Sequence, residues 1–220
     1  MKVGAVHAIR ALRTSLFVTP VSQRPRTPIR WLCLRAFSYL GEVESRSLDG
    51  ERLDQLCRAM ELGIFLNRCF DGKRPFSSGR YRELRRPLDG RSTREYLRRL
   101  KSLEASQPAS QNWKAVFQYR RDVLEISLRY LFNLSGIRQR DVLLPICSMV
   151  QLVDDVLDQK TDRKLGLPTF VTADGPSASQ LARMFWQELR TGREPEEMPF
   201  VASGWLVYLL ARFTILCFKA

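Results

Sequence analysis

The sequence predicts an all-α protein built as an antiparallel helical bundle, and three observations support this. Apolar residues recur with helical spacing along most of the chain. Stretches that contain glycine and proline separate these segments, and almost no stretch alternates in the manner of a β-strand. The chain has 220 residues, of which 45% are hydrophobic, so it is long enough to bury a substantial core. We therefore predict a basic N-terminal arm at residues 1–28 and a single helical domain at residues 29–220.

The N-terminal arm is basic, because seven Lys or Arg residues and no acidic residue precede Glu42. Residues 1–16 can form a basic amphipathic helix, and this composition is typical of an organelle-targeting segment. A mis-assigned start codon and a plain basic arm on a soluble protein explain the same residues. Three interpretations of the arm therefore stay open.

The helices of the domain follow from the apolar spacing and from the glycines and prolines that end it. We expect seven helices. In order, they lie at residues 29–39, 53–64, 96–103 and 113–134, at a segment that begins near Pro145 and includes residues 151–158, at 177–190 and at 200–218. Residues 72–90 are expected to form a basic loop, which is either a solvated surface or a clamp for a diphosphate beside Asp71.

The last apolar segment, residues 200–218, is long enough to span a bilayer. Gly204 and Arg212 favour a buried helix of the bundle instead. The given sequence stops at this apolar segment, which predicts a truncated bundle, a shortened gene model or a final core helix.

One acidic segment carries the clearest chemical signal: Gln151-Leu-Val-Asp154-Asp155-Val-Leu-Asp158. Its amide and three carboxylates are spaced i, i+3, i+4 and i+7, so on a helix they fall within an arc of roughly 100°. The opposite face is apolar, with Met149, Leu152, Val153, Val156 and Leu157. Three like charges this close repel one another, and carboxylates together with substrate phosphates suit Mg²⁺. The alternative is a solvated acidic face.

The acidic segment continues into Gln159-Lys-Thr-Asp-Arg-Lys164-Leu-Gly166-Leu-Pro168-Thr169. Residues 151–169 resemble the second aspartate-rich motif of trans-polyprenyl diphosphate synthases, which belong to the class I isoprenoid synthase superfamily. The family pattern is Gln-x-x-Asp-Asp-x-x-Asp, an acidic loop and Leu-Gly-x-Pro. The resemblance implies a helical bundle of the isoprenoid synthase type and a Mg²⁺-dependent prenyltransferase that acts on an isoprenyl diphosphate.

The same resemblance implies roles for individual residues. Asp154 is expected to be the principal Mg²⁺ ligand, with Asp155 and Asp158 as supporting catalytic acids. Gln151 and Lys164 are expected to bind the substrate. Catalysis would then consist of stabilising the leaving diphosphate while an allylic carbocation forms in an apolar pocket.

Two departures from the family pattern keep other functions open. No first DDxxD motif lies upstream, and the nearest substitute is the pair Asn67 and Asp71, followed by Lys73 and Arg74 as substrate-binding candidates. The simpler interpretation of that pair is the end of a helix. Leu167 stands where the family has a lysine. A terpene cyclase, a squalene or phytoene synthase-like enzyme and a non-catalytic relative are therefore alternatives.

The expected helix at residues 113–134 contains further basic residues that are candidates for binding the diphosphate. Arg121 forms a ladder with Glu125 and Arg129 at i, i+4 and i+8, which usually supports a helix surface. Alternatively, Arg120 or Arg121 contacts a diphosphate oxygen, and we include Arg121 among the substrate-binding candidates.

Composition limits the remaining function classes. The net charge of +13 is spread along the chain without a nucleic-acid-binding motif, so no nucleic acid is expected, while association with a membrane surface stays open. Five dispersed cysteines and one histidine argue against a disulfide framework and a zinc site. We expect a cytoplasmic protein, with organelle targeting or a peripheral membrane location as alternatives. A homodimer, or a heterodimer in which another subunit supplies the missing acids, is a further expectation.

Overall fold

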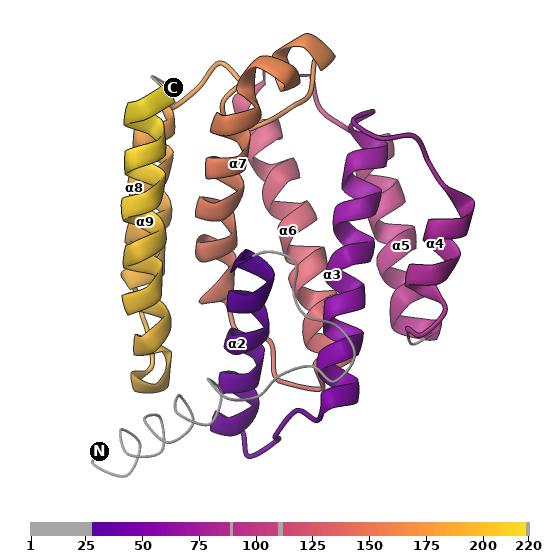
Figure 1. Cartoon of the computed structure of the whole chain (residues 1–220). Coiled ribbons are helices and arrows are strands. Elements are labelled where there is room, and N and C mark those ends of the chain that lie inside the picture. Colours follow the sequence, from indigo (N-terminus) through magenta and orange to yellow (C-terminus); the bar gives the residue numbers. More distant parts are fainter. Residues whose placement is uncertain (1–27, 89, 110–111, 219–220) are drawn as a thin grey trace. The chain divides into compact units, whose positions relative to one another are not determined.

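The computed structural model describes residues 28–88, 90–109 and 112–218. The expected N-terminal arm, residues 1–28, lies outside the described residues apart from Pro28, and so does the segment with the expected targeting function. The described residues form eight α-helices and one short 3₁₀ helix, with no strand among them (Figure 1). The prediction of an all-α protein is therefore confirmed.

Contacts divide the chain into two compact units. Unit 1 consists of Met1–Leu97 and Arg129–Gln139, and unit 2 consists of Arg98–Leu128 and Arg140–Ala220. Helices α5 (Gly90–Ala105) and α6 (Trp113–Ser135) contribute residues to both units.

In unit 1, helices α2 (Pro28–Val43) and α4 (Ser78–Arg85) both pack against α3 (Gly50–Phe70). Helix α3 begins at Asp49, whose side chain accepts a hydrogen bond from the Arg52 N–H and so satisfies one of the free amides of the first turn. The rings of Tyr96 and Tyr130 stack at 4.5 Å, and the hydroxyl of Tyr130 lies 2.9 Å from that of Thr93. These contacts join α5 and the end of α6 within unit 1.

Helix α4 lies inside the stretch 72–90 that the sequence led us to expect as a loop, so that prediction is wrong for residues 78–85. Ser77 caps the helix by accepting a hydrogen bond from the Arg80 N–H, and Arg80 donates to Glu83 at 2.7 Å. Only Leu84 of this helix is buried. With a single buried residue, the sequence of α4 shows no helical spacing of apolar residues. The helix was therefore not predicted, since its cap and its ion pair stabilise it without such a spacing.

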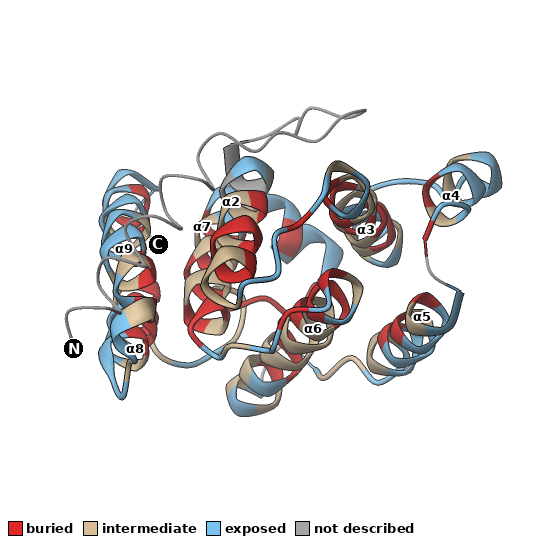
Figure 2. Cartoon of the chain, turned by 90° about the horizontal axis from the view of Figure 1, so that it is seen from below, coloured by how far each residue is buried: buried red, intermediate tan, exposed pale blue. Residues whose placement is uncertain are grey.

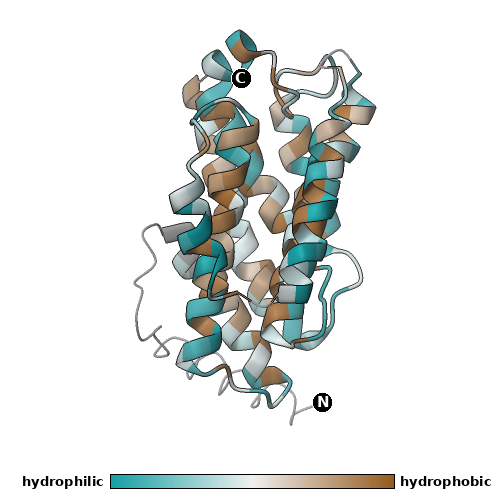
Figure 3. Ribbon diagram, turned by 90° about the vertical axis from the view of Figure 1, so that its right-hand side faces the viewer, coloured by the Kyte–Doolittle hydropathy of each residue, from teal (hydrophilic) through white to brown (hydrophobic). Residues whose placement is uncertain are grey.

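Unit 2 contains helices α7 (Leu143–Leu165), α8 (Ala178–Arg190) and α9 (Met198–Phe218), which pack against one another, and the 3₁₀ helix η1 (Pro195–Glu197). Helix α8 begins with a capping box between Ser177 and Gln180. Gly204 allows α9 to approach α8, because a Cβ atom at this position would overlap Cδ2 of the fully buried Leu189. Figure 3 shows both hydrophobic and hydrophilic residues along each of the helices nearest the viewer.

Candidate functional site

The acidic segment lies in the middle of α7, as its apolar spacing predicted. Pro145 is in the first turn, where a missing N–H costs little. The helix ends at Gly166, whose left-handed φ of 67° is the conformation that glycine adopts most readily. The Leu167 N–H then donates to the Asp162 carbonyl at 3.0 Å. Lys164 is exposed in the last turn, where its charge favours the carbonyl end of the helix.

The four polar side chains of the motif do not share one environment. Asp154 is exposed, Asp155 is only 2% exposed, and Gln151 and Asp158 are half-buried. Leu157, expected on the apolar face, is 52% exposed. Each residue turns about 100° around the helix, so the step from Asp154 to Asp155 passes from solvent into the core. The boundary between the buried and the exposed side of α7 therefore runs through the motif.

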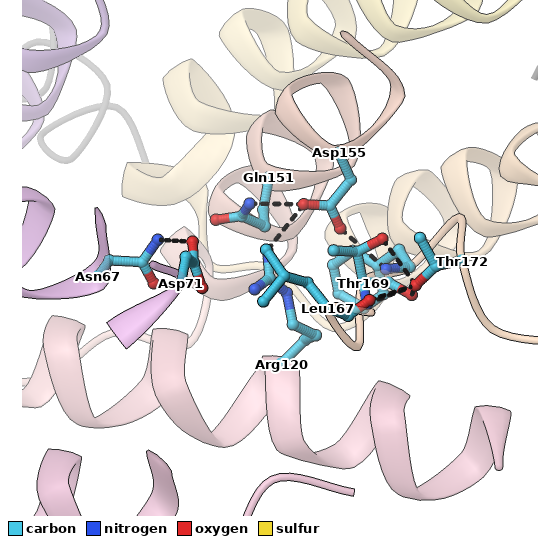
Figure 4. A network of polar contacts seen from close by, with 9 residues as sticks. Asn67, Asp71, Arg120, Gln151, Asp155, Leu167, Thr169 and Thr172 are labelled. Carbon is cyan, nitrogen blue, oxygen red and sulfur yellow. Dashed lines mark hydrogen bonds and ion pairs between the residues drawn. The ribbon is translucent and has the colours of Figure 1, made fainter. Parts of the chain in front are cut away.

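Asp155 is the centre of a buried polar network (Figure 4). Its Oδ1 accepts hydrogen bonds from Arg120 Nη2 at 2.7 Å and from Gln151 Nε2 at 2.8 Å. Its Oδ2 accepts from the Phe170 N–H at 2.8 Å. Arg120 is 8% exposed, so the two charges form a buried ion pair, which is tolerated because both members are paired and hydrogen-bonded.

The loop after α7 is ordered by the same network. Leu167 to Phe170 are all buried, and the Thr172 hydroxyl donates to the Leu167 carbonyl at 2.7 Å while accepting from the Thr169 N–H at 2.9 Å. The ring of Phe170 lies 5.5 Å from that of Phe185 on α8. Asp155 thus joins α7 to α6 through Arg120, and to the following loop through the Phe170 N–H. These contacts support α7 on its buried side.

Arg121 is held in an ion pair on another side of α6. Its two terminal nitrogens donate to the two carboxylate oxygens of Glu188 on α8 at 2.6 and 2.7 Å. These hydrogen bonds raise the pKa of Arg121. The structure thus brings Arg120, the neighbour weighed beside it, to the acidic motif, whereas a substrate contact of Arg121 stays a prediction.

The substitute for the missing first motif belongs to unit 1, whereas the acidic segment belongs to unit 2. Asn67 Nδ2 donates to Asp71 Oδ2 at 3.0 Å, so these two residues share a face as expected. Asp71 also caps the C-terminus of α3, which is the simpler interpretation of the pair. Lys73 is half-buried, and the Arg74 guanidinium lies over the ring of Phe65 at 5.6 Å.

The carboxylates available on α7 fit an open magnesium site better than a closed one. Among the described residues, no group of three or more His, Cys, Asp or Glu side chains is arranged to hold a metal ion. Mg²⁺ needs only one or two carboxylates beside water and substrate phosphates. Asp154 is exposed and Asp158 is half-buried, one turn apart on α7, whereas Asp155 is buried in its ion pair with Arg120.

Comparisons with known proteins find no relatives of the chain. No protein family matches it, and neither a curated protein nor a solved structure does. Membership of the isoprenoid synthase superfamily therefore stays a prediction from residues 151–169.

Three partners in the site were not predicted from the sequence: the Phe170 N–H, the Thr172 hydroxyl and the Glu188 carboxylate. A backbone donor leaves no mark in a sequence, since every residue except proline carries one. Glu188 is far from Arg121 in the chain, and no spacing rule joins residues of two different helices.

Proposed function

We propose that this protein binds an isoprenyl diphosphate through Mg²⁺ and acts as a prenyltransferase of the class I isoprenoid synthase type. The observation that carries the proposal is the pair of carboxylates one turn apart on α7, the exposed Asp154 and the half-buried Asp158. They lie in an all-α protein, within a segment that matches the family motif from Gln151 to Pro168.

The residues of the motif divide the work in this proposal. Asp154 and Asp158 hold Mg²⁺, which supplies positive charge to the leaving diphosphate. Asp155 is a positioning residue that acts through Arg120 and Phe170, because both of its oxygens already accept hydrogen bonds. Lys164 is exposed six residues beyond Asp158 on the same helix, less than two turns away, and in this proposal its long side chain contacts diphosphate oxygens.

A non-catalytic relative of the same superfamily is the second candidate. The buried ion pair between Arg120 and Asp155 favours it, because it gives the most buried acid of the motif a structural role. Such a protein keeps the architecture without turning over a substrate. Binding of a prenyl diphosphate without turnover would identify it.

The test is calorimetric titration of the full chain with a non-hydrolysable farnesyl diphosphate analogue, in Mg²⁺ and in chelator. We expect binding only in Mg²⁺, and a loss of affinity of about tenfold or more in Asp154→Ala and in Asp158→Ala, because each removes a charged ligand. Asp174→Ala is the matched control, since this exposed aspartate lies outside the motif. Binding that survives both the chelator and Asp154→Ala would contradict the proposal.

A further inference from the structure

Helix α9 presents an apolar face that no described residue covers. We define this outer face by six residues: Trp205, Leu206, Leu209, Leu210, Phe213 and Leu216. They are 42–69% exposed, and none of them is polar or charged. Figure 2 colours much of α9 as exposed. A contiguous apolar patch of this kind usually marks a binding surface.

The opposite side of α9 is already buried. Phe200, Gly204, Ala211 and Ile215 recur at helical spacing and are buried, and Gly204 lies against Leu189 of α8. The helix is therefore seated on protein along one side. A helix that crosses a bilayer alone would expose its whole circumference to lipid.

By length and composition, the segment Pro195–Phe218 is the one helix among the described residues that could cross a membrane. The charge around it does not favour an anionic lipid surface, however. Residues 140–220 contain nine basic and ten acidic residues, so the excess positive charge of the chain lies elsewhere in the sequence. Charge attraction, which strengthens the docking of interfacial helices on anionic lipid, is thus missing here.

The area of the outer face matches what a stable dimer needs. An aromatic side chain buries about 150–250 Å². With about 200 Å² taken for each of the six residues, their exposed fractions amount to roughly 700 Å², close to the share of one partner in an interface of standard size. An isologous contact uses the same patch on both subunits. We propose that the outer face of α9 binds the same face of a second copy of this chain.

A twofold axis perpendicular to the helix makes the two copies of α9 antiparallel. With the axis near Leu209 and Leu210, at the centre of the outer face, Leu206 of one copy faces Phe213 of the other. These two positions therefore decide the stability of the dimer. The proposal does not depend on the proposed function, because no residue of the acidic motif takes part.

Sedimentation velocity of the full chain, over a range of micromolar concentrations, tests the proposal. We expect a dimer for the wild type and a dissociation constant raised by about 100-fold or more in Leu206→Arg and in Phe213→Arg, because each places two charges in the apolar centre of the interface. Phe76→Arg is the matched control, since Phe76 is 60% and Phe213 66% exposed and Phe76 lies in unit 1. Circular dichroism checks that each variant stays helical, and Leu206→Gln and Phe213→Gln replace any arginine variant that does not.

Several results would overturn the proposal. A wild type that is monomeric at every concentration is one, and a heterogeneous series of aggregates is another. A dimer that persists in both outer-face variants would place the interface elsewhere. A monomer that sediments with anionic vesicles, and loses this binding in Phe213→Arg, would show that a membrane covers the face.

Discussion

Replacement of Asp155 by alanine tests the structural role of the buried carboxylate. The change removes the acceptor of three hydrogen bonds, from Arg120, Gln151 and the Phe170 N–H. Arg120, which is only 8% exposed, then keeps a buried charge without this partner. Removal of one member of a buried ion pair costs about 3–5 kcal/mol.

This cost translates into a large change of the melting temperature. For a chain of this size, 1 kcal/mol shifts Tm by about 2–4 °C, so we expect Asp155→Ala to lower it by roughly 6–20 °C. The double variant Arg120→Met/Asp155→Leu removes both charges and fills the space with apolar atoms. It should recover part of the loss, because apolar replacements of buried pairs are often neutral or stabilising, whereas the Phe170 N–H still lacks the acceptor that Asp155 provides.

Thermal unfolding followed by circular dichroism measures these effects. Asp154→Ala is the control for the adjacent, exposed carboxylate, and a surface change of this kind should stay within about 0.5 kcal/mol. A melting temperature of Asp155→Ala equal to that of Asp154→Ala would refute the reasoning. So would a double variant that is less stable than Asp155→Ala.

Three further predictions follow from single contacts. Desolvation raises the pKa of the half-buried Cys147 thiol to about 12, so this thiol should resist alkylation at about pH 9, where an unfolded thiol is largely ionised. The corresponding stability is complete below the usual thiol pKa and is lost as the pH rises towards about 12. Mass spectrometry of the labelled peptides checks this, and modification of folded and unfolded protein at equal rates would contradict it. Gly204→Val should cost about 1–3 kcal/mol, because its Cβ overlaps the buried Leu189, and a melting temperature equal to that of the wild type would exclude this close contact. Tyr130→Phe should lower the free energy of unfolding, measured with a chemical denaturant, by about 1 kcal/mol, because the buried Thr93 hydroxyl loses its partner at 2.9 Å. If the same substitution costs as much in a Thr93→Val background, the hydrogen bond is not the cause.

The helical architecture was largely predictable, because it depends on a periodic signal. In α7, buried residues recur at a spacing of three or four from Pro145 to Val156. The ends of α6 and α7 are set by Gly136 and Gly166, which the sequence displays directly. Helix α4 was missed because it is short and buries one leucine. Its stability comes from a cap and from contact with α3, and neither produces a period.

The candidate site was predictable only as a set of residue types. The spacing of Asp154, Asp155 and Asp158 places them within one arc, but it does not tell where the edge of the core lies. That edge is set by the helices that pack against α7, and it separates two adjacent aspartates. Whether Arg120 or Arg121 faces the acidic motif depends on how α6 is rotated about its axis. The sequence does not determine this rotation, because apolar residues lie on several sides of the helix.

We propose above all that the exposed side of α7 binds magnesium together with a prenyl diphosphate. The most direct measurement is the anomalous diffraction of crystals of the full chain grown with Mn²⁺, in place of Mg²⁺, and a farnesyl diphosphate analogue. We expect an anomalous peak for a metal ion that is bound by the carboxylates of Asp154 and Asp158 and by diphosphate oxygens. The ion pair between Arg120 and Asp155 should be intact in the same crystals. A bound analogue with no metal peak beside Asp154, or a metal held by other residues, would contradict the proposal.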